Sequence, residues 1–497
     1  MNIMMLLEMA TTDDGERIAV GGWTRRELFH RARVGADLLR GAGARELVYL
    51  GGGSAFPAAL FAAAWAGIPF VPLNYRLGTD QLTGLLDRHP GAAVLADRGC
   101  AAVARTWGTD EWITRTAGDA AGEAWRWDPE PATPAVVLYT SGTSARPKAA
   151  LLRHRHLLSY LLGSVEFAAA GADEAVLVSV PPYHVAGVSN LLSNIYAGRR
   201  IVYLEAFTPQ AWLATVRSQR VTHALVVPTM LARVVEHLDD VGAVADVPTL
   251  RSLAYGGAVM PRPVLEHGMR MFPGTGFVNA YGLTETSSTI AVLGPEDHRA
   301  ALAGDPVANR RLGSVGRLLP GVEVQVRSAD GTVLPAGTTG LVFVRGEQVS
   351  GEYGELGNTL DADRWFATRD RGRIDEDGYL FVEGRADDTI IRGGENIAPE
   401  EIEDVLLRHD GVAEAAVVGV PDEEWGQDIV AVVVPRAGAT VSETELRDWA
   451  MGRLRTSKSP ARVIFRNELP QTPTGKLLRR QVLADLLERA DNQLEVS

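Results

Sequence analysis

Residues 140–148, TSGTSARPK, gather side chains that suit a polyphosphate ligand. Hydroxyl donors, a glycine and a lysine occur here, at Thr140, Ser141, Gly142, Thr143 and Lys148. The hydroxyls donate hydrogen bonds, the glycine lets backbone N–H groups approach a ligand, and the lysine adds a mobile positive charge. The segment is not the GxxxxGK[ST] loop of kinases, because it holds one glycine and Ala149 follows the lysine. Taken alone, it also fits an exposed polar turn.

Six further segments follow in order and carry aromatic, acidic, basic and glycine residues. They are PPYHVAG at 181–187, YGGA at 255–258, NAYGLTET at 279–286, TRD at 368–370, GRADDTIIRGGENIAPEEIE at 384–403 and PQTPTGKLLR at 470–479. With 140–148, this series resembles the acyl-adenylate-forming superfamily, which includes acyl-CoA synthetases, peptide-synthetase adenylation domains and firefly luciferase. The resemblance spans residues 24–481.

The resemblance implies that a carboxylic acid attacks the α-phosphate of ATP, giving acyl-AMP and pyrophosphate. Several negative charges meet in that transition state, so cations and oriented dipoles must gather around it. By resemblance, the 140–148 loop holds the β- and γ-phosphates, and Thr284 contacts the α-phosphate. Glu285 binds Mg²⁺, a hard cation that prefers carboxylate and phosphate oxygens.

The nucleoside contacts implied by the resemblance come from four of the segments. Asp370 accepts hydrogen bonds from the ribose hydroxyls, with Arg385 beside it. Tyr281 stacks on the adenine. The edges of the base are contacted by Asn279 and by the backbone of Gly256, Gly257 and Ala258.

Lys476 is the expected catalytic residue, because the lysine of this motif reaches from a lid domain to the acyl carboxylate and the α-phosphate. In the second half-reaction, the resemblance implies that the lid rotates and that the thiol of CoA attacks acyl-AMP. Asp387 aligns with the hinge. The loop that then enters the site holds Arg392, Gly393 and Gly394, and its glycines permit a narrow tunnel for the pantetheine arm.

His184 resembles a histidine that lines the acyl pocket and gates the path of the thiol. A lone histidine after a strand is otherwise a common core residue. Three positions depart from the family pattern: Ala145 and Ala149 replace glycines of the phosphate loop, and Arg369 replaces the glycine of a TGD triplet. None of them removes a charged group that the mechanism needs.

The leading hypothesis is an AMP-forming acid:CoA ligase that uses ATP, Mg²⁺ and CoA. PPYHVAG offers no acidic residue for a substrate amine, so a carboxylic acid without an α-amino group is favoured. The acid itself is not readable from the sequence. Delivery of the acyl group to a separate carrier protein is one alternative, a luciferase-like oxidative reaction is another, and a non-catalytic acyl-nucleotide binder is a third.

These groups must be positioned by an α/β fold, because short β-rich runs alternate with longer helical runs up to about residue 280. Strands are predicted at 47–50, 92–96, 135–139, 175–180, 201–204, 224–227, 252–255 and 277–280. Shorter strands follow at 322–327, 341–345 and 379–382. A strand at 389–391, a helix at 399–408 and strands at 415–420 and 429–434 fit an α+β module.

The predicted organisation is a large N-terminal domain, 1–386, of parallel-sheet α/β subdomains with a β-rich subdomain at about 313–386. A small, mobile α+β lid, 387–497, follows. Within the first domain, Thr24 and Glu27 form a capping box, and Ser54 is predicted to cap a helix. His154 and His156 are two residues apart on a helix, which argues against a shared metal. The uncharged stretch 56–73 is interpreted as a buried helix and a strand, because prolines interrupt it.

Composition narrows the possible partners. The chain has 497 residues, 46% of them hydrophobic, and a formal net charge of −13, which disfavours binding to nucleic acid or anionic lipid. Its one cysteine, Cys100, cannot form an internal disulfide. The first residues lack a basic leader. We therefore expect a cytoplasmic monomer or homodimer without an integral membrane segment.

Overall fold

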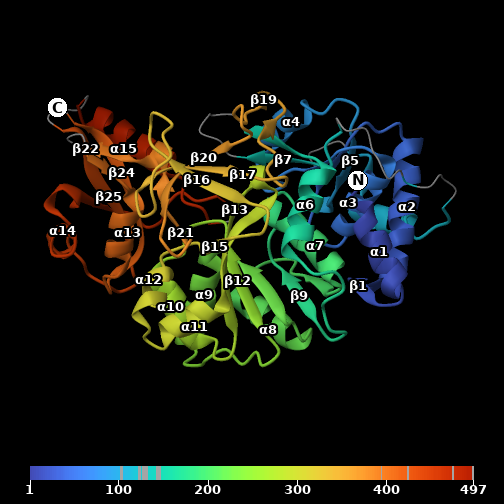
Figure 1. Ribbon diagram of the computed structural model, residues 1–497, viewed down its shortest axis with the longest axis horizontal. Helices are drawn as coiled ribbons and strands as arrows, with labels where there is room; N and C mark the ends of the chain where they lie inside the picture. The colour runs from blue at the N-terminus through green and yellow to red at the C-terminus, as the bar shows by residue number, and fades with distance from the viewer. Residues whose placement is uncertain are drawn as a thin grey trace.

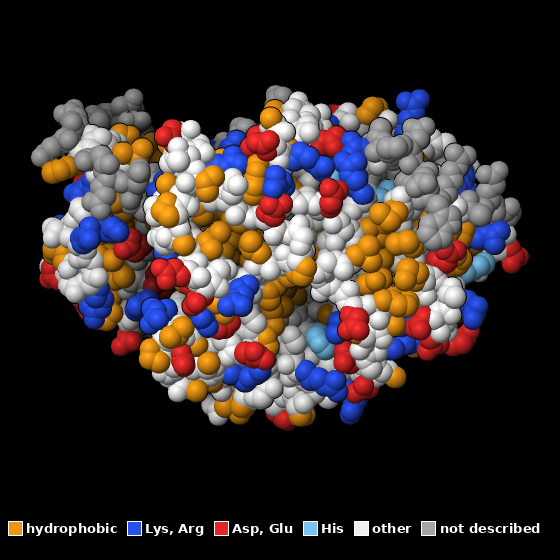
Figure 2. All heavy atoms as spheres, in the orientation of Figure 1, with side chains coloured by type: hydrophobic (Ala, Val, Ile, Leu, Met, Phe, Trp, Pro, Cys, Tyr) orange, Lys and Arg blue, Asp and Glu red, His pale blue; other side chains and the backbone are white. Residues whose placement is uncertain are grey.

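The computed structural model describes residues 1–100, 105–120, 125, 133–140, 147–392, 395–422, 425–472 and 475–494. A large N-terminal α/β domain is followed by a smaller C-terminal domain, as the sequence predicts. In Figure 1 the C-terminal elements, orange to red, form a separate body beside strands β20 and β21. Lys and Arg side chains are interspersed with Asp and Glu over the face shown in Figure 2, so this face carries no extended field of one sign.

A nine-stranded sheet forms one half of the N-terminal domain. Its order is β15 (Arg317–Leu318), β14 (Ser288–Leu293), β13 (Gly276–Leu283), β12 (Ser252–Gly256), β11 (His223–Val226), β9 (Ala175–Val178), β10 (Arg200–Tyr203), β1 (Ile18–Val20) and β2 (Trp23–Thr24). The strands from β13 to β1 run parallel. Successive parallel strands are joined by α7 (Val185–Ala197), α8 (Pro209–Ser218), α9 (Pro228–Asp240) and α10 (Arg262–Met271). Such sheets bind ligands at the carboxyl ends of their strands.

An eight-stranded sheet forms the other half. Its order is β19 (Gly357–Asn358), β18 (Glu352–Tyr353), β8 (Lys148–Leu152), β7 (Val136–Thr140), β4 (Phe70–Pro72), β3 (Leu47–Leu50), β5 (Ala93–Ala96) and β6 (Trp107–Gly108). Its helices are α1 (Met4–Asp14), α2 (Arg25–Gly41), α3 (Phe56–Ala66), α4 (Thr79–Leu86), α5 (Thr109–Arg115) and α6 (His154–Ser164). The α3–β4 segment is buried, which confirms the interpretation of the uncharged stretch. Across the described residues, no helix is long and apolar enough to cross a membrane.

Two further sets of strands complete the chain. A four-stranded antiparallel sheet contains β16 (Glu323–Arg327), β17 (Gly340–Arg345), β20 (Phe366–Ile374) and β21 (Leu380–Arg385). Two short helices precede it, α11 (Pro295–Leu302) and α12 (Pro306–Arg311). The C-terminal domain contains β22 (Ile390–Arg392), β23 (Glu395–Ile397), α13 (Pro399–Leu407), β24 (Val412–Asp422), β25 (Gly426–Pro435), α14 (Glu443–Met451), β26 (Arg462–Phe465) and α15 (Arg479–Leu494). Within the expected β-rich segment, β15, β18 and β19 pair with the two large sheets instead.

The two domains are connected through a short 3-10 helix, η3 (Ala386–Asp388), between β21 and β22. Among the described residues, no strand after η3 pairs with a strand before it. The orientation of the C-terminal domain therefore depends on the backbone of the four residues between β21 and β22 and on side-chain contacts across the interface.

Two predicted helix caps have different outcomes. The Thr24 hydroxyl accepts a hydrogen bond from Glu27 N at 3.1 Å, and a Glu27 carboxylate oxygen accepts from Thr24 N at 2.7 Å, which confirms the capping box. The prediction for Ser54 is wrong. The N-cap of α3 is Ala55, without a side-chain cap, because the chain turns one residue later than expected.

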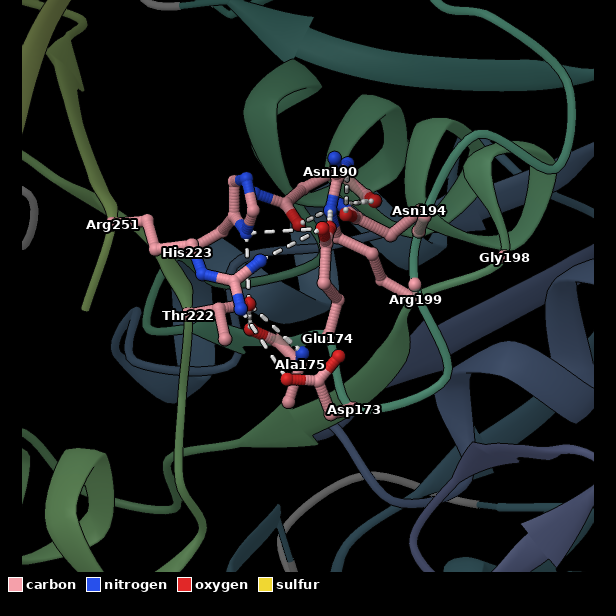
Figure 3. A network of polar contacts seen from close by, with 12 residues as sticks. Asp173, Glu174, Ala175, Asn190, Asn194, Gly198, Arg199, Thr222, His223 and Arg251 are labelled. Carbon is pink, nitrogen blue, oxygen red and sulfur yellow. Dashed lines mark hydrogen bonds and ion pairs between the residues drawn. The ribbon is translucent and has the colours of Figure 1, made fainter. Parts of the chain in front are cut away.

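A polar network lies at the amino ends of strands β9, β11 and β12 of the nine-stranded sheet (Figure 3). The Glu174 carboxylate accepts from Arg199 Nε at 2.8 Å and from Arg251 Nη1 at 3.3 Å. His223 Nδ1 lies 2.9 Å from the Thr222 hydroxyl, and burial, with Arg199, lowers the pKa of His223 to about 4. The network lies at the amino ends of these strands, opposite their carboxyl ends. It connects the first residues of neighbouring strands.

Candidate active site

The carboxyl ends of β12 and β13 place backbone where the adenine is expected. Gly256 ends β12, and a Cβ there would lie 2.3 Å from the Ala280 carbonyl oxygen, so only glycine fits this approach. Gly257 follows with φ +82°, a conformation that glycine adopts readily. After it, Ala258 is exposed. On the neighbouring strand, Asn279 Nδ2 donates to the Ser314 carbonyl oxygen at 3.4 Å.

Asp370, Arg385 and Tyr281 meet in one hydrogen-bonded group. Asp370 and Arg385 are paired across β20 and β21, and Arg385 Nη1 lies 2.8 Å from Asp370 Oδ1. The other Asp370 carboxylate oxygen accepts a hydrogen bond from the Tyr281 hydroxyl. Burial and the Asp370 charge raise the pKa of Tyr281 well above its ordinary value, so the phenol stays protonated and donates. The three residues lie up to 104 positions apart in the sequence, from 281 to 385, and the structure brings them together.

Glu285 and Tyr353 form a second group. Glu285 lies in the 3-10 helix η2 (Thr284–Thr286), directly after β13, and its side chain is almost buried. The Tyr353 hydroxyl donates to Glu285 Oε1 at 2.5 Å, and the Lys148 ammonium lies 6.0 Å from the centre of the Tyr353 ring. Burial and the Glu285 carboxylate raise the pKa of Tyr353. Sequence reasoning missed Tyr353, because its segment carries no recognisable spacing of reactive groups.

Strand β18 fixes the base of the 140–148 loop. Tyr353 pairs with Ala150 of β8, and Gly354 N donates to the Ala149 carbonyl oxygen at 2.8 Å. The Arg153 guanidinium binds both carboxylate oxygens of Glu352, at 2.9 and 2.6 Å. Lys148 itself pairs with Thr140 across β7 and β8, so both ends of the loop are held in the sheet.

Lys476 lies on a hairpin that packs against the N-terminal domain. Thr472 N donates to the Lys476 carbonyl oxygen at 2.8 Å, and Lys476 N donates to the Thr472 hydroxyl at 3.0 Å. Gly475, with φ +75°, lies at the turn, and a Cβ there would lie 2.2 Å from the hydroxyl oxygen of Thr229 in the first turn of α9. The hairpin backbone therefore lies directly on α9.

Lys476 interacts electrostatically with Asp370 and Arg385, the residues expected to bind the ribose. The side chain keeps a large exposed surface, although much protein surrounds it. Burial lowers the pKa of its ammonium, Arg385 adds to this, and the Asp370 and Asp388 carboxylates oppose it. The charges of Asp370 and Arg385 therefore act on Lys476.

Arg479, three residues after Lys476, joins several carboxylates of the C-terminal domain. Its guanidinium lies 2.6 Å from Glu403, 2.9 Å from Glu400 and 3.4 Å from Asp388 of η3. Glu403 also accepts from Val417 N at 2.7 Å. One cation shared among three carboxylates compensates their negative charge only in part. Burial raises the pKa of Glu400 to about 7.

His184 caps α7 with its backbone and is half-buried. Its Nε2 is buried and has no hydrogen-bond partner among the residues that the structure describes, and its ring centre lies 4.7 Å from that of Tyr183. Burial and the Arg76 charge lower the pKa of His184 to about 4, so the imidazole is neutral at pH 7. A neutral ring suits the apolar acyl pocket that the sequence analysis expects there.

Comparison with known proteins decides the family. A family model described as AMP-binding enzyme matches residues 8–354, and one described as AMP-binding enzyme C-terminal domain matches residues 401–476. The chain belongs to the AMP-binding enzyme family. This confirms the superfamily resemblance that the ordered motifs predict.

Curated relatives match this family member over most of its length. Indoleacetate–CoA ligase from Aromatoleum aromaticum is 34% identical, covering 86% of this chain and 85% of the relative. Feruloyl-CoA synthase from an Amycolatopsis species is 34% identical, covering 92% and 93%. Fatty acid–[acyl-carrier-protein] ligase ScoC from Streptomyces coeruleorubidus is also 34% identical, covering 85% and 83%.

Solved structures show the same fold. ATP-bound MatB from Rhodopseudomonas palustris superposes with a TM-score of 0.85 at 28% identity, covering 98% of this chain and 99% of the other. The apo form of the same protein gives 0.75 over the same coverage. The arrangement of this AMP-binding enzyme is therefore more similar to the ATP-bound form.

The remaining predicted residues are placed as follows. Arg392 lies in β22 and contacts its own domain: Nη1 donates to the Ser457 carbonyl oxygen at 2.9 Å, and Nε lies 3.0 Å from Asp428. Five predicted binding residues and one departure lie outside the described residues, namely Ser141, Gly142, Thr143, Gly393, Gly394 and Ala145. His154 Nδ1 accepts from Ile3 N and His156 Nδ1 from Arg153 N, each at 3.3 Å, so the two histidines have separate partners.

Proposed function

We propose that this chain is an AMP-forming acid:CoA ligase. It joins a carboxylic acid to the α-phosphate of ATP, releases pyrophosphate, and transfers the acyl group from acyl-AMP to the thiol of CoA, releasing AMP. The observation that carries the proposal is the packing of Gly475 on Thr229, because it holds the Lys476 hairpin against the N-terminal domain, where the charges of Asp370 and Arg385 act on the Lys476 ammonium. The greater similarity to an ATP-bound relative supports the same arrangement.

In this proposal, the chain's residues lower the cost of bringing anions together. The Lys476 ammonium lies beside the new carboxyl–phosphate bond and neutralises charge that develops there. Asp370 is held by Arg385 and Tyr281, so its carboxylate is already oriented to accept hydrogen bonds from ribose hydroxyls. Preorganised groups do not need to rearrange as the reaction proceeds.

Glu285 fits the expected role of magnesium ligand. Its carboxylate is nearly buried, with one oxygen bound by the Tyr353 hydroxyl and no cation within the hydrogen-bonded group. Mg²⁺ is usually bound through one or two carboxylates together with substrate phosphates, and it would neutralise phosphate charge here. Thr140 and Lys148, held on paired strands, would face the β- and γ-phosphates. Thr284, in the same turn as Glu285, would face the α-phosphate.

For the acceptor half-reaction, we propose that the C-terminal domain turns about η3, with Asp387 at the hinge and 387–497 as the lid. Arg392 and the adjacent glycines would then enter in place of Lys476. At present Arg392 contacts Ser457 and Asp428 of its own domain, so it can move with that domain as a unit.

We propose that the acid carries an aromatic ring and lacks an α-amino group. The names of two relatives, indoleacetate–CoA ligase and feruloyl-CoA synthase, support an aromatic acid. The neutral His184 and the small Gly256 at the end of β12 are compatible with a flat ring. We propose a cytoplasmic location, a compartment in which ATP and CoA are both available.

A test is pyrophosphate release with a panel of aryl, arylalkyl and fatty acids, with and without CoA. We expect pyrophosphate with at least one acid, and AMP and acyl-CoA only when CoA is present. Absence of pyrophosphate with every acid, despite tight binding of acyl-AMP, would favour the non-catalytic binder.

Transfer to a carrier protein is the second candidate, favoured by the 34% identity to an acyl-carrier-protein ligase. The same assay separates the two, because a carrier-dependent enzyme releases AMP with a phosphopantetheinylated carrier and not with free CoA.

A further inference from the structure

Arg369 has an unusual backbone for an arginine. Its φ is +63°, in the left-handed region that glycine prefers. It lies in a bulge of β20, where the register to β17 shifts between the pairs Phe343–Ala367 and Leu341–Arg371. Glycine is the usual residue at such a bulge position. An arginine is therefore held here at a conformational cost.

The Arg369 side chain reaches the connection between the domains. Its Nη1 lies 3.3 Å from Asp387 Oδ2, in the middle of η3. The next residue, Asp388, is bound from the other side by Arg479 at 3.4 Å. The two consecutive aspartates are thus held by different domains, Asp387 from β20 and Asp388 from α15.

The contacts of Asp387 and Asp388 are connected to Lys476 through Arg479 and the 472–476 hairpin. Arg479 lies three residues after Lys476, and the hairpin between Thr472 and Lys476 rests on Thr229. An ion pair that fixes η3 against β20 therefore also favours the orientation in which Lys476 reaches Asp370.

We propose that Arg369 is a positioning residue that latches Asp387 and so favours the domain arrangement for adenylation over the arrangement for thioester formation. The inference rests on the proposed function. The side chains are 49% and 35% exposed, and ion pairs of this kind contribute weakly. We expect the latch to shift the balance of the two half-reactions about two- to fivefold.

The test measures the two half-reactions separately in wild type, Arg369→Gly, Arg369→Lys, Asp387→Asn and the double variant Arg369→Gly/Asp387→Asn. Adenylation is followed by pyrophosphate release, and thioester formation by acyl-CoA produced from supplied acyl-AMP and CoA. In Arg369→Gly and Asp387→Asn, we expect the ratio of thioester formation to adenylation to rise about two- to fivefold at low salt. At high salt the wild-type ratio should rise toward that of the variants, because screening weakens the pair that only wild type has.

Further variants and a stability measurement test whether the effect comes from the Arg369–Asp387 ion pair. Arg369→Lys should keep most of the wild-type ratio, and the double variant should match the single variants, since both remove the same pair. Arg345→Ala removes a comparably exposed ion pair with Glu323 away from η3 and should leave the ratio unchanged. The thermal midpoint of Arg369→Gly should equal or exceed that of wild type, because glycine suits this φ.

An unchanged ratio in Arg369→Gly and Asp387→Asn, or additive effects in the double variant, would overturn the latch. Failure of the proposed function has a different signature, because wild type itself would then form no acyl-CoA from acyl-AMP.

Discussion

Asp370 and Arg385 face each other on neighbouring strands, with 2.8 Å between Asp370 Oδ1 and Arg385 Nη1. Arg385 is the last residue of β21 and directly precedes η3. The pair expected to hold the ribose therefore lies next to the connection between the domains. Nucleotide binding and the position of the C-terminal domain share this one piece of backbone.

Asp370→Asn should raise the KM for ATP by about 10- to 100-fold, because a hydrogen bond to a charged group contributes about 1.5–3 kcal/mol. The measurement is pyrophosphate release against ATP concentration. Asp173→Asn, an exposed aspartate paired with Arg251 at the far edge of the sheet, is the matched control and should keep the wild-type KM. An ATP KM within twofold of wild type in Asp370→Asn would remove Asp370 from the nucleotide site.

Lys476→Ala should lower acyl-AMP formation by roughly 100-fold or more, because losing a preorganised charged donor costs about 3 kcal/mol. Formation of acyl-CoA from supplied acyl-AMP should continue, because Lys476 is not used in that step. Lys458→Ala, which removes another C-terminal-domain lysine paired with Glu401, should affect adenylation little. Equal losses of both half-reactions in Lys476→Ala would argue against two domain arrangements.

Tyr353→Phe should raise the Mg²⁺ concentration needed for half-maximal adenylation, by about tenfold. The substitution leaves Glu285 without the phenol that orients its carboxylate. Titration of Mg²⁺ at fixed ATP measures this, and direct Mn²⁺ binding in the presence of ATP gives a readout independent of turnover. Tyr379→Phe removes a hydroxyl from a different carboxylate, Asp297, and serves as the control. Unaltered metal dependence in Tyr353→Phe would show that the phenol does not position Glu285.

Glu400→Gln should flatten the dependence of stability on pH between about 4.5 and 7. The pKa of Glu400 is raised to about 7 from 4.5, so the folded protein binds this proton more tightly than the unfolded chain. The resulting stabilisation is fully present below pH 4.5 and is lost as the pH rises through 7.

Since Gln mimics the protonated acid, the thermal midpoint of Glu400→Gln should fall less than that of wild type between pH 5 and 8. The difference at pH 8 corresponds to on the order of 1–3 kcal/mol. Glu401→Gln, an exposed neighbour, is the control. Parallel curves for wild type and Glu400→Gln would contradict the raised pKa.

Glu174→Gln should destabilise the fold by about 1–2 kcal/mol, because Arg199 and Arg251 lose a common anionic partner. Thermal or urea unfolding measures this. The KM for ATP should stay unchanged, since the network of Figure 3 lies at the opposite sheet edge. A changed KM with unchanged stability would place Glu174 in the substrate site instead.

The strands could be read from the sequence because their patterns are local. The predicted strand at 252–255 is β12, and the helix at 399–408 is α13 within one residue. The strand at 277–280 is longer than predicted and extends to Leu283, because antiparallel pairing with β14 supports its polar end. Such support comes from a partner strand and leaves no periodicity in the strand itself.

Asp370 and Lys476 were predictable as candidate site residues, because the motifs that hold them belong to an ordered series that resembles the family. Tyr353 was not, because its importance arises when β18 pairs with β8, about 200 residues earlier in the chain. Thr229 was not predictable for the same reason, since only the docked hairpin gives it a role.

The covalent link through η3 has a mechanical consequence. With four residues between β21 and β22, a small torsional change at Asp387 turns a domain of more than a hundred residues. Residues of that domain then move in proportion to their distance from η3. Substitutions at η3 should therefore change the turnover rate of the enzyme rather than its affinity for either substrate.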